Sequence, residues 1–472
     1  MASIKKSTKK STKKEAELPK DFAKAFKPAD IRAIYPTQID EELAYRVARA
    51  FVVYYKLKKV VVGRDMRLSS PSLAKSFIKG LKDQGANVVD IGLTDTPGTY
   101  FASGKMNLYG AMITASHNPK EYNGIKLVKA GAIPLTEEDG LQDIRALVIA
   151  NDFAEPKKKG TVVKKDILES YKKYLHSFVS INKKRKVRIV VDAGNGMSSK
   201  LRPILEYKSL FEIVPLFFKL DGSFPNRGSD PTVERNMEPV KAHVKKMKPD
   251  FGVAFDGDVD RVGFFDEEGR YVDAAVVGAL ITKHLLEEKK KLKIVYNNFT
   301  SKSFLETIIK YGGTPVRAKV GHSFIKNIMR EEDAVFSCEH SAHFYFKENF
   351  YTDSGIIALL RIVEEYANPK NEGKKFSEIV AEFNKYKQTE EVLIEVSKKE
   401  EILKTVEDMY KGKNPLKLDT FDGLYVEFAD YWFCLAKSIT EDALKLVLEA
   451  VDEKTMQERQ AEILALVKKL DA

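Results

Sequence analysis

Three aspartates stand at alternate positions in the segment DGDVDR, where Asp256, Asp258 and Asp260 follow the apolar run FGVAF. Alternate residues of an extended segment project to the same side, so these three carboxylates should converge. Converging carboxylates repel one another unless a cation offsets their charge. The segment lacks the pattern of an EF-hand, so we expect Mg²⁺ that completes its shell with water or a phosphate oxygen, with Arg261 beside it to hold a phosphate or carboxylate. The alternative is an acidic turn after a buried strand.

A second segment, ITASHNPKEYNGIK, surrounds Ser116 with His117, Asn118 and Pro119 and ends at Lys126. Asn, Pro and Gly are typical of surface turns, and a capped turn is one interpretation. The other is a phosphate carrier, because a serine beside a histidine and a lysine has groups that phosphoryl transfer needs. A phosphoryl group on Ser116 would supply the missing oxygen ligand of a metal bound by the three aspartates.

Both segments need strands that end in polar loops, and the sequence predicts such strands. Short β-branched runs, each followed by a Gly- or Asp-bearing turn and an amphipathic helix, recur along the chain. The first strands are expected within 58–65, 86–94 and 108–119, with a helix over 71–85. The pattern restarts at 186–200, 250–261, 293–313 and 333–346. This alternation predicts α/β domains with mixed or parallel sheets, whose ligand loops lie at the carboxyl ends of strands.

The C-terminal part differs from the rest, because residues 417–450 contain two strand-like runs before a helix. A chain of 472 residues is also too long for one hydrophobic core. We therefore predict three similar mixed-sheet α/β domains and a smaller α+β C-terminal domain. The expected ranges are 1–19 for a disordered Lys-rich tail, 20–163 with the serine segment, 164–269 with the aspartate segment, 270–385, and 386–472.

The composition, 43% hydrophobic and 31% charged, is that of a soluble globular protein. No apolar run is long enough to span a bilayer and none near the N-terminus resembles a signal peptide, so no membrane partner is expected. The two cysteines show neither metal-type spacing nor a disulfide framework, which fits a reducing cytoplasm. Much of the net charge of +11 comes from the tail, where nucleic-acid binding is a weaker interpretation than solubilisation.

Four motifs occur in one order along the chain: TASHNP, DGDVDR, GHSFIK (321–326) and CEHSAHFYF (338–346). Together with FKPADIRAIYP, VGRDMRLSSP, NGIKL, VDAGNGM and DGSFPNRGSDPTVERN, they resemble the α-D-phosphohexomutase superfamily, most closely the phosphomannomutase/phosphoglucomutase group. The similarity extends from about Phe26 to Glu449 and depends on the ordered set, since no single motif is decisive. The resemblance implies four domains around a central cleft, with a sugar-specificity loop in the third and a phosphate loop in the fourth.

The resemblance also implies roles for single residues. Ser116 would be the phosphoserine and, with Asp256, Asp258 and Asp260, would bind one Mg²⁺ per chain. Residues that would assist proton movement and stabilise charge at the transfer site are Arg32, Lys126 and His343. Residues expected to bind substrate are Glu339 and Ser341 at the sugar hydroxyls, Lys319 and His322 around the Gly-His-Ser loop, Arg261, and Lys437, Ser438 and Thr440 in the C-terminal phosphate loop.

The implied reaction interconverts hexose 1-phosphate and hexose 6-phosphate, with mannose or glucose as the sugar. Phospho-Ser116 would give a hexose 1,6-bisphosphate, which turns within the cleft while a mobile C-terminal domain closes and loosens. The expected partners are hexose phosphates, and the expected assembly is a monomer or homodimer. Alternatives are a phosphoglucosamine mutase, or a paralogue that binds sugar phosphates with weak or no mutase turnover.

The C-terminal loop departs from the family pattern. Where the family has Arg-x-Ser-(Gly or Asn)-Thr-Glu-Pro, this chain has AKSITED, with Ala436 at the arginine position. Loss of a bidentate guanidinium weakens a phosphate site, although Lys437 supplies a point charge. At positions where the family usually has glycine, this chain has Ala33, Val259, Cys338 and Ala342. Val259 would be strained only if its backbone requires a positive φ angle.

Overall fold

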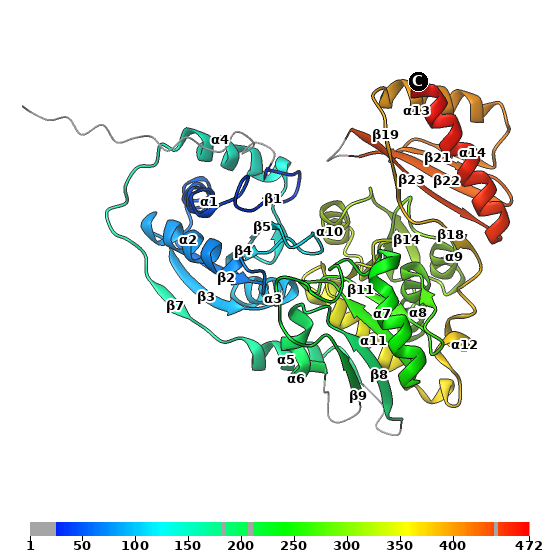
Figure 1. Cartoon of the computed structure of the whole chain (residues 1–472), viewed down its shortest axis with the longest axis horizontal. Coiled ribbons are helices and arrows are strands. Elements are labelled where there is room, and N and C mark those ends of the chain that lie inside the picture. Colours follow the sequence, from blue (N-terminus) through cyan, green and yellow to red (C-terminus); the bar gives the residue numbers. More distant parts are fainter. Residues whose placement is uncertain (1–24, 181–184, 206–210, 439–441, 472) are drawn as a thin grey trace, which may run out of the picture.

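The computed structural model describes residues 25–180, 185–205, 211–438 and 442–471. The predicted disordered tail at 1–19 and the substrate residue Thr440 lie outside these ranges. The described chain forms four sheets with their own helices, which we call domains I to IV in chain order (Figure 1). This arrangement confirms the predicted fold class of three α/β domains and a smaller C-terminal α+β domain. The predicted boundaries after 163, 269 and 385 stay predictions.

Domain I contains β1 (Ile31–Ile34), α1 (Glu41–Tyr55), β2 (Lys59–Arg64), α2 (Ser70–Asp83), β3 (Asn87–Leu93), α3 (Thr96–Met106), β4 (Tyr109–Ile113), β5 (Tyr122–Lys129), β6 (Ile133–Pro134), η2 (Glu137–Leu141), α4 (Gln142–Ala150) and β7 (Val162–Lys164). Its sheet has the order β1-β5-β4-β2-β3-β7, with β6 beside β5. The predicted strands and helix at 58–119 are confirmed. Val60, Val61 and Val62 of β2 are all buried, as is typical of a strand covered on both faces.

The order in which the chain forms the sheet of domain I places the serine segment at a topological switch point. Helix α2 leads from β2 to β3 and packs with α1 and α4 on one face of the sheet, whereas α3 leads back to β4 on the other face. The chain thus reverses direction between β2 and β4. Loops diverge at such a switch point and leave a crevice for a ligand. The loops that follow these two strands carry Asp65 and Ser116.

Domain II contains α5 (Leu168–His176), β8 (Val187–Asp192), η3 (Met197–Leu201), α6 (Arg202–Leu205), β9 (Phe211–Leu216), α7 (Glu234–Met247), β10 (Phe251–Phe255), β11 (Val262–Phe265) and β12 (Tyr271–Val272). The strand order is β12-β11-β10-β8-β9. The aspartate segment forms the turn between β10 and β11, which pair antiparallel. All five residues of β10 are buried, so the sheet fixes the start of this turn.

Domain III contains α8 (Ala274–Glu288), β13 (Lys293–Tyr296), α9 (Lys302–Lys310), β14 (Thr314–Arg317), α10 (His322–Glu331), β15 (Phe336–Cys338), β16 (Phe344–Phe346), η5 (Lys347–Asn349), β17 (Thr352–Asp353), α11 (Gly355–Tyr366), η6 (Pro369–Asn371) and α12 (Phe376–Val380). The strand order is β14-β13-β15-β16-β17. One hydrophobic core joins domains II and III to the α3 face of domain I. These three domains therefore form one packed body.

Domain IV contains β18 (Lys387–Gln388), β19 (Val392–Glu395), α13 (Lys399–Lys411), β20 (Lys417–Asp419), β21 (Leu424–Glu427), β22 (Tyr431–Lys437), β23 (Ala443–Ala450) and α14 (Glu453–Asp471). The helix expected at the end of 417–450 is wrong, because this segment is β23. Leu444, Val447 and Leu448 mimic the spacing of a helix, but β23 is a central strand and both of its faces are buried.

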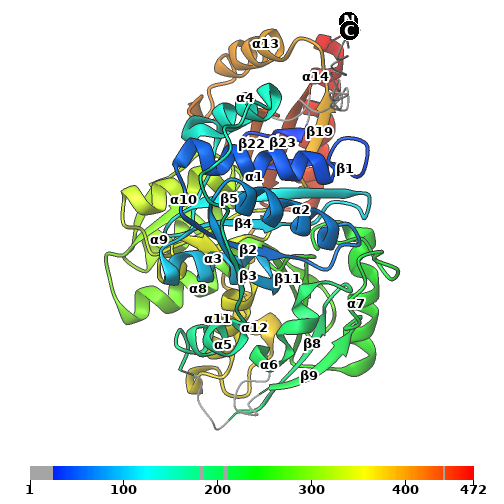
Figure 2. The ribbon, with the colours of Figure 1, turned by 90° about the vertical axis from the view of Figure 1, so that its left-hand side faces the viewer.

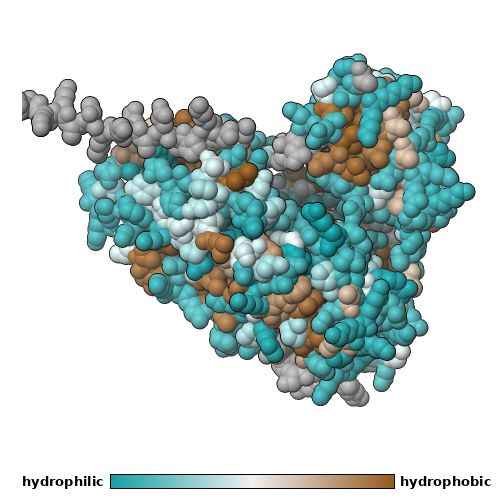
Figure 3. All heavy atoms as spheres, in the orientation of Figure 1, coloured by the Kyte–Doolittle hydropathy of each residue, from teal (hydrophilic) through white to brown (hydrophobic). Residues whose placement is uncertain are grey.

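Domain IV has a hydrophobic core of its own. It meets domain III through a small cluster in which Trp432, Cys434 and Ala436 pack near Phe299. In both ribbon views the domain stands at the end of the molecule opposite domain II (Figures 1 and 2). The surface is hollowed between domains I and IV, as the predicted cleft requires (Figure 3). Within the described part of the chain, no helix is long and apolar enough to cross a membrane.

Candidate active site

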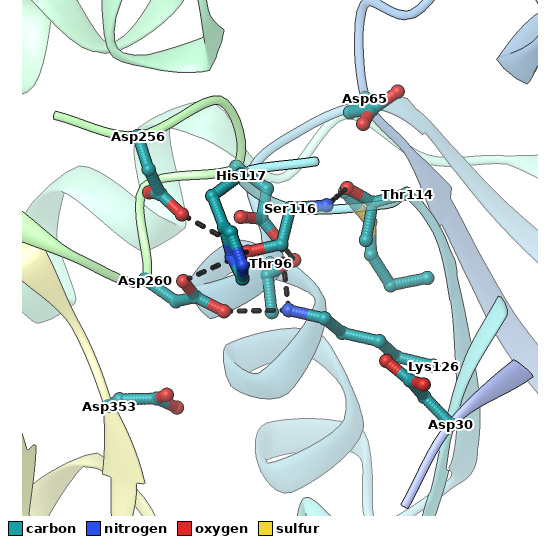
Figure 4. Close-up of polar contacts among 12 residues, drawn as sticks. Asp30, Asp65, Thr96, Thr114, Ser116, His117, Lys126, Asp256, Asp260 and Asp353 are labelled. Atoms are coloured by element: carbon teal, nitrogen blue, oxygen red, sulfur yellow. Dashed lines mark hydrogen bonds and ion pairs between the residues drawn. The ribbon is translucent and has the colours of Figure 1, made fainter. Parts of the chain in front are cut away.

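The serine segment and the aspartate segment meet in the structure (Figure 4). Ser116 Oγ lies 3.1 Å from Asp256 Oδ2 and 3.5 Å from Asp260 Oδ1. One carboxylate oxygen from each of the three aspartates lies within 4.8 Å of the others. All four side chains belong to residues that are at most 2% exposed. The convergence that the alternate spacing predicts is therefore present, and the serine hydroxyl borders it.

Lys126 offsets part of the negative charge. Its Nζ lies 2.9 Å from Asp258 Oδ2 and 2.6 Å from Asp260 Oδ2. Burial lowers the pKa of Lys126, but the two carboxylates raise that pKa well above its ordinary value. The pKa of Asp256 is raised well above its usual range, first by burial and then by Asp260 and Asp258. One ammonium group therefore does not offset three ionised carboxylates, and without a further cation Asp256 favours its protonated form.

A divalent cation would compensate the remaining negative charge of the three carboxylates. Asp258 Oδ1 is buried and has no hydrogen-bond partner among the described residues. A buried carboxylate oxygen without a partner costs free energy, and a metal ion removes that cost. Three carboxylates around one point are oxygen ligands of the type that Mg²⁺ prefers. The residues present thus fit a magnesium ion.

Three loop residues at this site have left-handed backbone conformations. The φ angles are 50° at Ser116, 69° at Val259 and 65° at Ala342. A β-branched residue is rare in this region because its side chain crowds the backbone. The condition for strain at Val259 is therefore met. Val259 is fully buried in the core shared by domains II and III, so the packing of its side chain opposes the cost of the strain.

Arg67 binds the backbone of the serine segment, a role that the sequence analysis did not predict. Its two terminal nitrogens donate to four backbone carbonyl oxygens, those of Ser116, Asn118, Pro119 and Tyr122, at 2.6 to 3.0 Å. Its side chain is fully buried and lies 3.4 Å from the Asp65 carboxylate. The signal available in the sequence was an Asp and an Arg two residues apart directly after β2, at the switch point.

The aspartate segment is held in a similar way by Arg227. Its Nε donates to Asp192 Oδ2 at 2.8 Å, and its Nη2 donates to the carbonyl oxygen of Phe255 at 2.7 Å. Thr96 joins the segment to domain I, because its backbone N–H donates to the Asp258 carbonyl oxygen at 3.0 Å and its hydroxyl to Asp258 Oδ2 at 2.5 Å. Backbone and side-chain contacts thus fix both segments before any ligand binds.

Further predicted residues approach the same place. Arg32 Nη1 donates to Asn118 Oδ1 at 2.8 Å, which puts this guanidinium on the serine segment. Arg261 Nε donates to His343 Nε2 at 3.0 Å, and its Nη1 lies 3.5 Å from Asp230 Oδ2. The pKa of Arg261 is raised, since the surrounding carboxylates outweigh its burial. Domains I, II and III therefore each contribute a cationic or titratable group.

The Glu339 loop and the Gly-His-Ser loop touch one another in domain III. The backbone N–H of Gly321 donates to Glu339 Oε1 at 3.2 Å, and the Tyr345 hydroxyl donates to Glu339 Oε2. Of the other predicted substrate residues, His322 and Ser341 are half-buried and Lys319 is exposed. Burial lowers the pKa of His322 to about 3, and nearby Lys326 adds to this effect. His322 is therefore a neutral hydrogen-bonding group.

The C-terminal loop is separate from this cluster. Lys437 Nζ lies 2.6 Å from Glu400 Oε1 of α13, and the Ser438 backbone N–H donates to the carbonyl oxygen of Ala443 at 2.9 Å. Both contacts remain within domain IV. As far as the structure describes the loop, no hydrogen bond or ion pair links it to Ser116 or the aspartates. Ala436, at the position of the family arginine, is buried against the domain III interface.

Comparison with known proteins places these features in a family. Models for phosphoglucomutase/phosphomannomutase alpha/beta/alpha domains I, II and III match residues 23–155, 169–269 and 273–386. The phosphomannomutase of Vibrio cholerae serotype O1 is 35% identical over 459 residues, which cover 94% of this chain and 98% of that protein. The phosphomannomutase of Methanocaldococcus jannaschii is 37% identical over 451 residues, covering 95% and 98%.

Solved structures agree with this placement. A phosphoglucomutase/phosphomannomutase family protein from Burkholderia thailandensis superposes with a TM-score of 0.85 at 28% identity, covering 95% of this chain and 97% of that one. The N-acetylphosphoglucosamine mutase of Aspergillus fumigatus, solved with GlcNAc-6P and magnesium, has a TM-score of 0.62 at 15% identity, covering 95% and 97%, and shares the fold. The chain therefore belongs to the phosphoglucomutase/phosphomannomutase group of the α-D-phosphohexomutase superfamily, and it is a phosphohexomutase enzyme.

Proposed function

We propose that this enzyme interconverts the 1-phosphates and 6-phosphates of mannose and glucose through a phosphorylated Ser116. The observation that carries this proposal is the position of Ser116 Oγ, 3.1 Å from Asp256 Oδ2 and 3.5 Å from Asp260 Oδ1, with Lys126 bound to the same carboxylate cluster. Phosphoryl transfer needs cations around the phosphate oxygens and in-line positioning of the attacking oxygen. A hexose 1,6-bisphosphate is the proposed intermediate and activator.

One Mg²⁺ per chain is proposed to complete the site. Asp256, Asp258 and Asp260 would hold it, together with an oxygen of the Ser116 phosphoryl group. When bound, the ion supplies charge stabilisation to the transferring phosphoryl group. Asp258 Oδ1, which has no hydrogen-bond partner in the described part of the chain, and the raised pKa of Asp256 support this assignment.

The protein side chains divide the remaining work. Lys126 and Arg32 supply positive charge on the side of Ser116, and Arg261 supplies it on the side of His343. His343 is the group that accepts the proton of the attacking sugar hydroxyl. Glu339 can accept hydrogen bonds from two adjacent sugar hydroxyls, because each carboxylate oxygen has more than one lone pair. Further substrate contacts are proposed for Ser341, Lys319 and His322, and for Lys437, Ser438 and Thr440 at the distal phosphate.

A second candidate is a paralogue that binds sugar phosphates but turns them over weakly. Ala436 at the arginine position and the pairing of Lys437 with Glu400 favour it, since both weaken a distal phosphate site. A phosphoglucosamine mutase is the other alternative, and the choice of sugar separates it from the main proposal. The cytoplasmic location and the monomer or homodimer state stay predictions.

A turnover assay tests the proposal. The protein is incubated with glucose 1-phosphate, mannose 1-phosphate or glucosamine 1-phosphate, in the presence of Mg²⁺ and a trace of glucose 1,6-bisphosphate. We expect conversion of the glucose and mannose phosphates, and loss of conversion in Ser116→Ala. The matched control is Ser76→Ala, which removes the hydroxyl on α2 that donates to the Glu41 carbonyl oxygen of α1, away from the site. If no sugar is converted while calorimetry detects binding of the same sugars, the binding paralogue replaces the mutase.

A further inference from the structure

A buried pair of charged side chains lies behind His343 and has no role in the function proposed above. Asp353 ends β17, directly opposite Tyr345 of β16. Asp353 Oδ2 lies 2.8 Å from His343 Nδ1, and Asp353 Oδ1 lies 2.7 Å from Lys326 Nζ. Asp353 and Lys326 are each only 1% exposed. Burying two charges this completely is costly, and each oxygen of the carboxylate lies within ion-pair distance of one nitrogen.

The contacts on the two ring nitrogens of His343 determine which nitrogen carries the proton. Arg261 Nε–H can only donate, and it donates to His343 Nε2 at 3.0 Å, so Nε2 is an acceptor. Asp353, paired with an ammonium group, is an ionised carboxylate and can only accept. His343 Nδ1 is therefore the nitrogen that carries the proton, and it faces Asp353 Oδ2 at 2.8 Å, although the two groups are not aligned as a hydrogen bond in this structure. The ring is the neutral Nδ1–H tautomer, and its Nε2 lone pair faces Arg261.

Lys326 fixes the second oxygen of Asp353 and ties the pair to domain I. It extends from α10, and its Nζ lies 3.5 Å from the hydroxyl of Tyr100 on α3 and 4.7 Å from the centre of that ring. Atoms of Asp260, His343 and Asp353 also lie within 4.8 Å of one another, as ligands of a metal would. An ammonium group 2.7 Å from Asp353 disfavours a second cation there. The arrangement is better suited to orienting His343.

We propose that Asp353 is a positioning residue that, with Lys326, holds His343 as the Nδ1–H tautomer and leaves Nε2 to take the proton of the attacking sugar hydroxyl. This inference rests on the proposed function. The sugar oxygen bonds to the phosphorus of phospho-Ser116 while the bond between phosphorus and Ser116 Oγ breaks. One proton moves from the sugar oxygen to His343 Nε2 and then to Ser116 Oγ, which leaves with the bonding pair. Arg261 occupies Nε2 in this structure, and the sugar hydroxyl takes its place.

The chain holds a matched arrangement away from the site, between α8 and α11. Glu365 is 1% exposed, its Oε2 lies 2.9 Å from His284 Nδ1, and its Oε1 lies 3.0 Å from Lys370 Nζ. It is therefore also a buried carboxylate between a histidine and a lysine. Glu365→Gln makes the same chemical change as Asp353→Asn without touching the proposed site, so it is the control for a purely structural effect.

The tautomer is tested on the full-length protein with ¹⁵N-labelled histidine, by correlating the ring nitrogens with the ring protons in an NMR spectrum. The protein has seven histidines, and His343→Gln assigns the signal. We expect the Nδ1–H pattern for His343 in the wild type and a mixture of the two tautomers in Asp353→Asn, because an amide can donate to Nδ1 once Arg261 moves away from Nε2, as it must for the sugar hydroxyl. An Nε2–H pattern in the wild type, or an unchanged pattern in Asp353→Asn, would overturn the proposal. This readout does not need turnover, so it stands even if the mutase assay fails.

Kinetics test the functional part of the inference. We expect Asp353→Asn to lower kcat by about tenfold to about a hundredfold with KM within about twofold, because the bound sugar loses a correctly oriented base. Glu365→Gln should leave kcat within about twofold. Equal losses in the two variants, or no loss in Asp353→Asn, would contradict the positioning role. If Asp353→Asn does not fold, Lys326→Gln replaces it, and wild-type kcat with a wild-type His343 pattern in that variant would overturn the proposal.

Discussion

Ser116 and the three aspartates are at most 2% exposed, whereas the side chains of Lys437 and Glu400 on the C-terminal loop and α13 are 50% and 79% exposed. The first group lies where domains I, II and III share one core, and two buried arginines hold its loops. The second group belongs to a domain with a separate core, which meets domain III through one apolar cluster and several hydrogen bonds and ion pairs.

Under the proposed function, this difference means that positioning is divided between the two ends of the substrate. Phosphoryl transfer depends on precise placement, and small displacements of reacting groups cost rate. A distal phosphate contributes binding energy, which tolerates a looser and more solvated contact. The bound bisphosphate must also reorient within the cleft, and a domain that can move away from it allows this reorientation. Three predictions test the comparison, beginning with the largest expected effect.

Asp256→Asn should lower mutase turnover by about a thousandfold or more, since it removes a carboxylate from the proposed metal site. In the presence of a chelator, the same substitution should raise the stability of the folded protein instead of lowering it. The pKa of Asp256 is raised in the folded protein, so its contribution to stability is present below the unfolded pKa and is lost as pH rises through the folded pKa. At pH 8 we therefore expect a higher Tm for the variant than for the wild type.

Differential scanning calorimetry in EDTA and in Mg²⁺ checks this prediction. Added Mg²⁺ should raise the Tm of the wild type and leave that of Asp256→Asn nearly unchanged. Asp166→Asn is the control, because Asp166 is an exposed carboxylate that accepts from the Leu168 backbone N–H at 2.9 Å. If Asp256→Asn retains wild-type turnover, the aspartate cluster is an acidic turn and not a metal site.

Arg67→Lys should lower kcat by about tenfold to about a hundredfold and destabilise the protein by about 3 kcal/mol, because an ammonium cannot reach four carbonyl oxygens and the Asp65 carboxylate together. Steady-state kinetics and urea unfolding measure the two effects. The control is Arg185→Lys, since Arg185 also donates to three carbonyl oxygens, those of Tyr366, Asn371 and Lys374, far from Ser116. The Arg185→Lys variant should be less stable than the wild type but have the same kcat. Equal kcat losses in both variants would remove the special role of Arg67.

Lys437→Ala should have the smallest effect, with KM for the hexose phosphate raised by about threefold or less and kcat unchanged. Lys437 is bound to an exposed carboxylate, and such a pair contributes little free energy. Lys445→Ala is the matched control, because Lys445 pairs with Glu391 at 2.7 Å in the same domain. A rise in KM of more than about tenfold would mean that the C-terminal loop grips the distal phosphate firmly, and the contrast between the two ends would fail.

The sequence predicts the chemistry-bearing loops better than the groups that support them. The alternate spacing of Asp256, Asp258 and Asp260 and the loop position of Ser116 follow from local rules of strands and turns. Arg67 and Arg227 were missed because their partners are backbone carbonyls that only the tertiary fold brings near. Asp353 was missed for the same reason, since β17 meets Lys326 through sheet pairing and helix packing.

Strand β23 and Val259 show why local sequence patterns do not predict the whole structure. β23 was expected as a helix because a strand buried on both faces has no alternation of polar and apolar residues. Val259 has a φ angle of 69°, which no propensity favours for a β-branched residue. Val259 adopts this conformation in the turn between β10 and β11, where the three carboxylates converge.

The most direct test of the central claim, that Ser116 carries the phosphoryl group, is the intact mass of the protein after incubation with glucose 1,6-bisphosphate and Mg²⁺. We expect the wild type to gain the mass of one phosphoryl group and to lose it again when glucose 6-phosphate is added in excess. Ser116→Ala should show no such gain. A phosphoryl group that remains in Ser116→Ala, or a wild type that never gains one, would contradict the account.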